Sequence, residues 1–176
     1  RYLGYTLTGL TREQVIAFLH GGGANGKSTL LDLMFYIMGN YALKLPAETL
    51  MAHRGVERHP TDVAQLHGAR LAISNEIDEG EFWGESKLKE LTGDETLTGR
   101  FMRQDYFTFR SRHKHIIAGN HRPQVRAMDD ALRRRILLVP FRQKFEGDRR
   151  DNNLGMKLRE DAPAILADLV EAAAEW

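Results

Sequence analysis

The sequence predicts an α/β protein in which helices flank a largely parallel central sheet, and three observations support this. Short, continuous apolar runs of strand length recur along the chain, as is typical of strands buried on both faces of a sheet. Segments with apolar residues at helical spacing separate these runs, and such alternation favours parallel pairing. A glycine cluster at residues 21–26 joins the first run to the first helical segment.

These patterns place the expected elements in chain order. We expect buried strands at residues 15–19, 70–74, 115–118 and 136–139. We expect helices at residues 27–38, 62–67 and 85–92. Gly39 and Gly93 are stop signals after two of them, and Asp161 begins a last helix that accepts Pro163 in its first turn. Alternating residues at 96–98 and 106–109 predict a β-hairpin.

Composition limits the classes of function. The 176 residues include 25 Lys and Arg, 24 Asp and Glu, and no Cys. This balance excludes a polycationic nucleic-acid coat, and the lack of Cys excludes disulfides and thiolate zinc sites. No apolar run is long enough to span a bilayer and no signal peptide opens the chain, so we expect no membrane partner and a cytoplasmic protein, in the host cytoplasm if phage-encoded. We also expect a fragment of something longer.

Three regions are expected along the chain. Residues 1–14 form a helical lead-in, residues 15–145 form the core that carries the motifs, and residues 146–176 form a C-terminal helical segment. The seven His show no metal-like clustering beyond His113 and His115, so zinc is not expected.

Residues 21–28 fit the pattern G-x-x-x-x-G-K-[ST] of a phosphate-binding P-loop. Glycine lets backbone N–H groups approach a polyphosphate closely, and the following helix N-terminus attracts anions. Lys27 is then expected to reach the β- and γ-phosphates, and Ser28 to hold Mg²⁺. A flexible glycine turn is the alternative, which the flanking strand and helix disfavour. The candidate ATP-binding residues are Gly21, Gly22, Gly23, Ala24, Asn25, Gly26, Lys27, Ser28 and Thr29.

An acid and an amide follow two other expected strands. Glu76 comes at the end of the strand that starts at residue 70, and we expect that strand to lie beside the P-loop strand. There the carboxylate can activate water and help hold Mg²⁺, directly or through water. Asp78 and Glu79 are nearby candidates for the same role, and the alternative is that Glu76 is only a solvated acid. Asn120 can hydrogen-bond both the γ-phosphate and the attacking water, although alone it reads as a turn residue.

Two basic segments have both a functional and a simpler interpretation. Arg133, Arg134 and Arg135 precede an apolar strand and form either a solvated charge run or an arginine finger for the nucleotide of a neighbouring subunit. Residues 100–114 combine cationic and aromatic side chains around the expected hairpin. This segment either binds single-stranded DNA or is a solvated basic hairpin without a binding role. The candidate DNA-binding residues at the hairpin tip are Arg100, Arg103 and Gln104.

These motifs together resemble the phage and plasmid primase-helicase family with a superfamily 3 helicase module, similar to the poxvirus-type helicase-primase. The segments that carry the resemblance are 2–5, 23–29, 68–76, 89–93, 98–100, 118–123, 134–141 and 164–176. The resemblance implies a P-loop NTPase of the AAA+-like superfamily 3 type, with ATP and Mg²⁺ as cofactors. It further implies ATP-dependent unwinding of replication-fork DNA by a homo-oligomeric ring, usually a hexamer, with single-stranded DNA in its channel and a primase domain upstream.

The resemblance also implies roles for single residues. Lys27 and Ser28 carry ATP and Mg²⁺, Glu76 is the catalytic acid, Asn120 is the sensor, and either Arg134 or Arg135 is the finger. Lys89 and Arg100 fall in an extra motif linked to DNA binding and nucleotide coupling.

Three positions depart from the family pattern. Asp94, Glu95 and Arg133 stand where the family more often has Gly, Asp and Trp, which leaves the role of that turn and the choice of finger open.

Other functions remain as alternatives. A nucleotide-dependent DNA-binding module with little hydrolysis is conceivable, because Asn75 occupies the place of a first carboxylate. The sequence lacks the Asn-Lys-x-Asp element that a GTPase switch would need, and its arginine motif and hairpin disfavour a small-molecule kinase.

Overall fold

The computed structural model describes residues 1–52, 60–75, 82–121, 124 and 129–176. Within them the main sheet has five strands in the order β2-β3-β6-β1-β7, and every neighbouring pair is parallel. The predicted α/β class with a parallel sheet is therefore confirmed. The strands of this sheet are β1 (Ile16–His20), β2 (Ala42–Lys44), β3 (Leu71–Asn75), β6 (Lys114–Gly119) and β7 (Ile136–Pro140).

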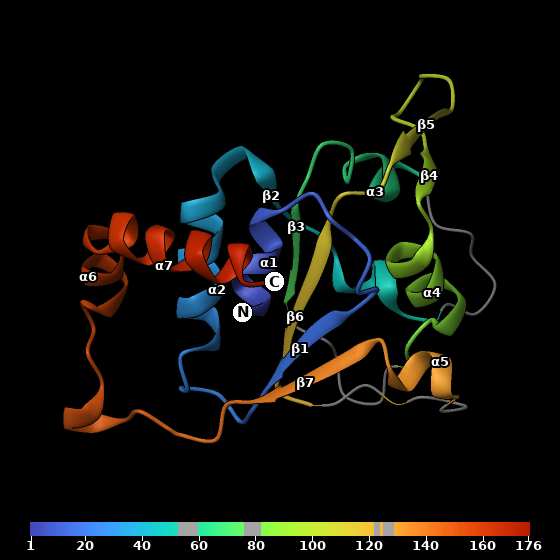
Figure 1. Ribbon diagram of the computed structural model, residues 1–176. Helices are drawn as coiled ribbons and strands as arrows, with labels where there is room; N and C mark the ends of the chain where they lie inside the picture. Colours follow the sequence, from blue (N-terminus) through green and yellow to red (C-terminus); the bar gives the residue numbers. More distant parts are fainter. Residues whose placement is uncertain (53–59, 76–81, 122–123, 125–128) are drawn as a thin grey trace.

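Helices cover both faces of this sheet (Figure 1). One face carries α1 (Tyr2–Leu7), α2 (Lys27–Met38), α6 (Leu154–Glu160) and α7 (Ala162–Ala174). The other face carries α3 (Thr61–Ala64), α4 (Glu85–Gly93) and α5 (Asp130–Arg133). Short 3-10 turns form η1 (Gly39–Tyr41), η2 (Ala47–Leu50) and η3 (Gly147–Arg149). No helix of the described part of the chain is both long and apolar enough to cross a membrane.

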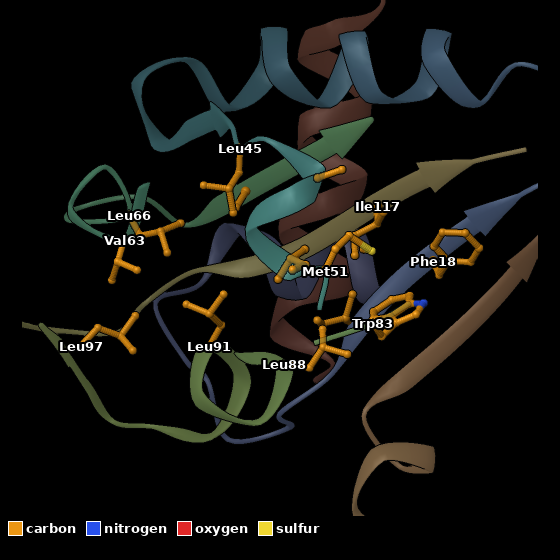
Figure 2. Close-up of a cluster of buried hydrophobic side chains, with 14 of the residues drawn as sticks. Phe18, Leu45, Met51, Val63, Leu66, Trp83, Leu88, Leu91, Leu97 and Ile117 are labelled. Atoms are coloured by element: carbon orange, nitrogen blue, oxygen red, sulfur yellow. The ribbon is translucent and has the colours of Figure 1, made fainter. Parts of the chain in front are cut away.

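Alternate residues of β1 point into two separate hydrophobic clusters. Ile16 and Phe18 join the cluster under α4, where Phe18 meets Trp83 edge to face with ring centroids 5.9 Å apart (Figure 2). Ala17 and Leu19 join the cluster under α2 on the opposite face. Because β1 and β6 lie inside the sheet, both faces of these strands are covered, and this explains their continuous apolar sequence.

The strand β7 lies at the edge of the sheet, where it pairs with β1. Its Leu137 and Leu138 are 42% and 46% exposed, so the expectation of a buried strand at residues 136–139 is wrong. An apolar run indicates a strand, but it does not reveal whether other elements cover both of its faces.

The two ends of the chain meet on the α2 face. Helix α1 packs against α7, and a Cβ on Gly4 would lie 2.6 Å from the carbonyl oxygen of Leu169, so only glycine allows this close approach. The ring of Tyr5 stacks on Trp176 with centroids 4.7 Å apart. Helix α1 lies within the lead-in expected to be helical, while the expected domain boundaries stay predictions.

The predicted hairpin is confirmed as a separate two-stranded antiparallel sheet, β4 (Thr96–Gly99) and β5 (Phe107–Arg110). Leu97 pairs with Phe109, and both side chains are buried. The hairpin projects at the end of the molecule opposite to the carboxyl ends of the main strands (Figure 1). Its tip, residues 100–106, is therefore presented far from the P-loop.

Candidate nucleotide-binding site

The glycine cluster forms the turn between β1 and α2, as its sequence predicts. Gly23 and Gly26 have φ angles of 84° and 86°, in the left-handed region that glycine adopts without a Cβ clash. Gly26 is the N-cap of α2, so the helix begins at Lys27. The unpaired N–H groups of the first helical turn therefore lie at the loop, where an anion can meet them.

Lys27 is held by three oxygen acceptors of the protein. Its Nζ donates to the carbonyl oxygen of Gly21 at 2.6 Å, to Oδ1 of Asn25 at 3.1 Å and to Oδ1 of Asn120 at 3.3 Å. The residue is only 6% exposed, and this burial lowers the pKa of its ammonium group. Neutral acceptors thus orient the ammonium toward the end of the sheet, and a phosphate would offer it a stronger, charged partner.

Asn120 follows β6, the strand directly beside β1. His20 at the end of β1 is in register with Gly119 at the end of β6, which brings the P-loop and Asn120 to the same edge of the sheet. The predicted proximity of amide and P-loop lysine is therefore observed.

The expected position of the acid strand is wrong in one respect. Strand β3, which leads to Glu76, is not beside the P-loop strand, because β6 lies between β1 and β3. Chain order does not fix sheet order, and the later strand takes the central place. Asn75 at the end of β3 is exposed into the site, whereas Glu76, Asp78 and Glu79 lie outside the described residues.

A cleft of about 1130 Å³ opens where these strand ends meet the P-loop. Ser28 and Thr29 line it beside Lys27, and Asn75 and Asn120 line it from the sheet. Ligand pockets typically have about 300–1,000 Å³, so the cleft has room for a nucleotide. The Ser28 hydroxyl, exposed in this cleft, is the kind of oxygen donor that Mg²⁺ accepts.

Sequence reasoning missed a third group of residues that line this cleft. Arg149, Arg150 and Arg159 line it from the C-terminal segment, to which no binding role was assigned. The signal was the adjacent pair Arg149-Arg150, which by itself looks like a solvated charge run.

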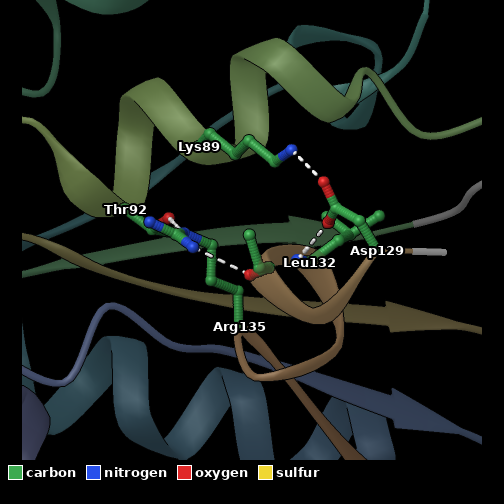
Figure 3. Close-up of polar contacts among 6 residues, drawn as sticks. Lys89, Thr92, Asp129, Leu132 and Arg135 are labelled. Atoms are coloured by element: carbon green, nitrogen blue, oxygen red, sulfur yellow. Dashed lines mark hydrogen bonds and ion pairs between the residues drawn. The ribbon is translucent and has the colours of Figure 1, made fainter. Parts of the chain in front are cut away.

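The two candidate finger residues differ in their surroundings, and Figure 3 shows those of Arg135. Arg135 is 8% exposed and donates to Oγ1 of Thr92 at 3.2 Å, to the carbonyl oxygen of Ala131 at 2.7 Å and to Oε1 of Gln14 at 3.1 Å. All three partners belong to the same chain. Arg134 is exposed, so its guanidinium is available to another molecule.

Lys89 is also committed within the chain (Figure 3). Its Nζ lies 2.6 Å from Oδ2 of Asp129, whose Oδ1 accepts the N–H of Leu132 at 2.7 Å and caps α5. The hydrogen bond from Lys89 and that from Leu132 hold the pKa of Asp129 below its usual range. Lys89 thus ties α4 to α5, and its expected role in DNA binding stays a prediction.

The hairpin residues lie together at the tip. Arg103 and Gln104 are exposed, and the guanidinium carbon of Arg100 lies 4.7 Å from the centroid of the Tyr106 ring. The tip thus presents cationic and aromatic groups side by side, which suits a nucleic-acid strand.

Viral proteins resemble this chain in sequence. It is 28% identical over 144 residues to an Acanthamoeba polyphaga mimivirus protein named as a helicase, a match that covers 81% of this chain and 15% of that protein. It is 29% identical over 140 residues to a Fowlpox virus protein named as a primase, with 77% of this chain and 17% of that protein covered. The chain therefore spans about a sixth of the length of these relatives.

Solved structures of the NrS-1 C-terminal region share the fold. Two apo structures superpose with TM-scores of 0.74 and 0.76 at 18% identity. Each match covers 96% of this chain, and the matches cover 39% and 40% of the two solved chains, respectively. The predicted resemblance to viral primase-helicases of the poxvirus type is confirmed. A family model described as a family of unknown function, DUF5906, matches residues 19–135, more than half of the sequence, and the chain belongs to this family.

Proposed function

We propose that this chain is the ATP-dependent DNA helicase module of a replication primase-helicase, a P-loop NTPase of the AAA+-like superfamily 3 type. The observation that carries the proposal is the position of the Lys27 ammonium, next to Asn120, in a cleft at the carboxyl ends of parallel strands. Open α/β sheets bind ligands at this edge. Relatives named as helicase and primase support the same function.

In this proposal the P-loop binds the triphosphate of ATP. The N–H groups of residues 21–29 and the first turn of α2 surround the phosphates, while Lys27 exchanges its neutral acceptors for the β- and γ-phosphates. Ser28 and the carboxylate of Glu76 would hold Mg²⁺, which offsets phosphate charge when bound.

Hydrolysis then needs a positioned water and a proton acceptor. Glu76 is proposed to accept the proton, and the Asn120 amide to orient the water against the γ-phosphate. The amide oxygen that now accepts from Lys27 is within reach of the same region. A transition state with spread negative charge is stabilised by cations placed in advance.

Those cations are proposed to come partly from a neighbouring subunit. Arg134 is exposed on the short helical segment after Asp130, while Arg135 holds that segment in place. A homo-oligomeric ring, expected to be a hexamer, would place Arg134 of one subunit in the cleft of the next. The hairpin tip with Arg100, Arg103 and Gln104 would contact single-stranded and replication-fork DNA in the ring channel.

ATP turnover with and without single-stranded DNA, recorded with the mass of the species in solution, tests this function. We expect turnover that rises with DNA and with assembly. Glu76→Gln distinguishes the helicase from a DNA-binding module with little hydrolysis. The exposed Asn75 at the end of β3 favours this second possibility. A steep loss of turnover supports the enzyme, and unchanged turnover supports the binding module.

A further inference from the structure

The chain after β7 runs past the P-loop before it enters α6 (Figure 1). We refer to residues 141–159 as the arm. The N–H of Phe145 donates to the carbonyl oxygen of Ala24 at 2.8 Å, and Nδ2 of Asn25 donates to the carbonyl oxygen of Phe141 at 3.2 Å. A Cβ on Gly21 would lie 2.3 Å from that same Phe141 oxygen. The arm is thus joined directly to the phosphate-binding loop.

The far end of the arm is fixed as well. Helix α6 packs against α2, and the guanidinium carbon of Arg159 lies 5.3 Å from the centroid of the Tyr36 ring on α2. Nη2 of Arg149 donates to the carbonyl oxygen of Lys144 at 2.7 Å. Backbone hydrogen bonds at one end and helix packing at the other therefore fix the arm, while Arg149 and Arg159 also contact Lys144 and Tyr36.

The acidic groups of the arm that pair do so with lysines. Lys144 pairs with Glu146 and Lys157 pairs with Asp151, each at 2.7 Å. The hydrogen bond from Lys157 also lowers the pKa of Asp151. Within the described residues, no carboxylate forms an ion pair with Arg149, Arg150 or Arg159.

Among the described residues that line the cleft, cations outnumber acids. The described lining holds four cationic side chains, Lys27 and the three arginines of the arm, against the two carboxylates Asp32 and Asp151. One of these two, Asp151, is already paired. An anion entering the cleft would thus meet positive charge from the glycine loop and from the arm.

We infer that Arg149, Arg150 and Arg159 form a second phosphate-binding wall, which holds the terminal phosphates of a nucleoside triphosphate from the side opposite to Lys27. This inference rests on the proposed function and adds cationic contacts from the same subunit that binds the nucleotide. Guanidinium groups suit the role, because their planar donor sets bind phosphate oxygens in a bidentate way. Arg150 has the most freedom to turn toward the phosphates, since its guanidinium forms no hydrogen bond or ion pair with the described residues.

Nucleotide binding by the whole chain tests this inference. The affinity of the variant Arg149→Gln/Arg150→Gln/Arg159→Gln for ATP should be at least about tenfold lower than that of wild type. Its affinity for ADP should fall less, and its affinity for AMP should hardly change. The melting temperature should fall only slightly, because the Arg149 hydrogen bond and the Arg159 contact with Tyr36 involve exposed side chains. Arg142→Gln is the matched control, since Arg142 is an exposed arginine of the same arm that does not line the cleft.

The outcomes separate this inference from the proposed function. If Lys27→Met loses ATP while the triple variant binds it like wild type, the second wall is refuted and the proposed function stands. If wild type binds no ATP, both fail. Equal losses for ATP, ADP and AMP, or a loss confined to single-stranded DNA, would each overturn the phosphate contact.

Discussion

The ammonium nitrogen of Lys27 lies 3.3 Å from Oδ1 of Asn120, a residue 93 positions later in the chain. This contact joins the loop after β1 to the end of the neighbouring strand β6. It places the two groups that the proposed chemistry needs within one hydrogen bond of each other. It also means that phosphate binding at Lys27 would release the oxygen of Asn120 for another donor.

Replacing Lys27 should abolish nucleotide binding. Lys27→Met keeps the buried stem but removes a charge worth about 4 kcal/mol against a phosphate at ~4 Å before desolvation, at an effective dielectric of ~20. We expect ATP affinity to fall at least about a hundredfold and turnover to vanish. Lys44→Met, an exposed lysine at the end of β2, is the control for both measurements. Retained turnover in Lys27→Met would move the site elsewhere.

Replacing Arg134 should slow hydrolysis and leave ATP binding intact. Arginine fingers contribute about 10³–10⁵ in rate, so Arg134→Ala is expected to lose turnover on that scale. Mixing Arg134→Ala with Lys27→Met should restore part of the activity, because mixed rings contain interfaces with an intact loop on one side and an intact finger on the other. Assembled mixtures that remain inactive would refute a finger acting between subunits.

Replacing Arg135 should instead lower stability. Arg135→Ala leaves Thr92, Gln14 and the Ala131 carbonyl without their donor, at a cost of about 1–3 kcal/mol. For a chain of this size, thermal unfolding should shift down by roughly 2–4 °C per kcal/mol. Arg133→Ala removes an exposed neighbour and should shift the melting temperature by far less. An unchanged melting temperature in Arg135→Ala would contradict the structural role.

Replacing Arg103 should weaken DNA binding and make it less sensitive to salt. Arg103 is exposed at the hairpin tip, where it can neutralise one phosphate. Arg103→Ala should reduce the slope of log affinity against log salt for single-stranded DNA by about 1. Arg112→Ala, an exposed arginine beyond the hairpin, serves as the control. An identical affinity and slope in Arg103→Ala would leave the tip without a DNA role.

Stability should fall as the solution is acidified below about pH 6.5. His113 and His115 are 3% and 1% exposed, and burial lowers the pKa of His113 to about 4 and that of His115 well below its usual value. The charge on Lys114 lowers the pKa of His113 further. The folded protein keeps both rings neutral, whereas the unfolded chain binds protons near pH 6.5, so the stabilisation present above that pH is lost as the pH falls toward 4.

Urea unfolding between pH 7.5 and 5 measures this effect. Each histidine should cost about 1.4 kcal/mol of unfolding free energy per pH unit once the pH is below 6. His67→Gln, at an exposed position, should leave the slope unchanged. A flat profile over this range would show that the two buried rings take up protons without unfolding.

Local features of the fold follow from local sequence. The helix at residues 27–38 has the predicted bounds because Gly26 and Gly39 mark its two ends and apolar spacing fills its interior. The hairpin is predictable because polar and apolar residues alternate on both of its strands. Strand β2 and helix α5 were not expected, since three or four residues carry too little periodicity to be recognised.

The sequence by itself determined the glycine turn before α2, the strand ends that carry Asn75 and Asn120, and the parallel α/β class, because these depend on residue types within short segments. Only the tertiary structure decided that β6 separates β3 from β1, that Arg135 is internal while Arg134 is exposed, and that the arm brings three arginines to the cleft. These relationships join residues that are distant in the chain. They are determined by packing between segments, which no local sequence pattern encodes.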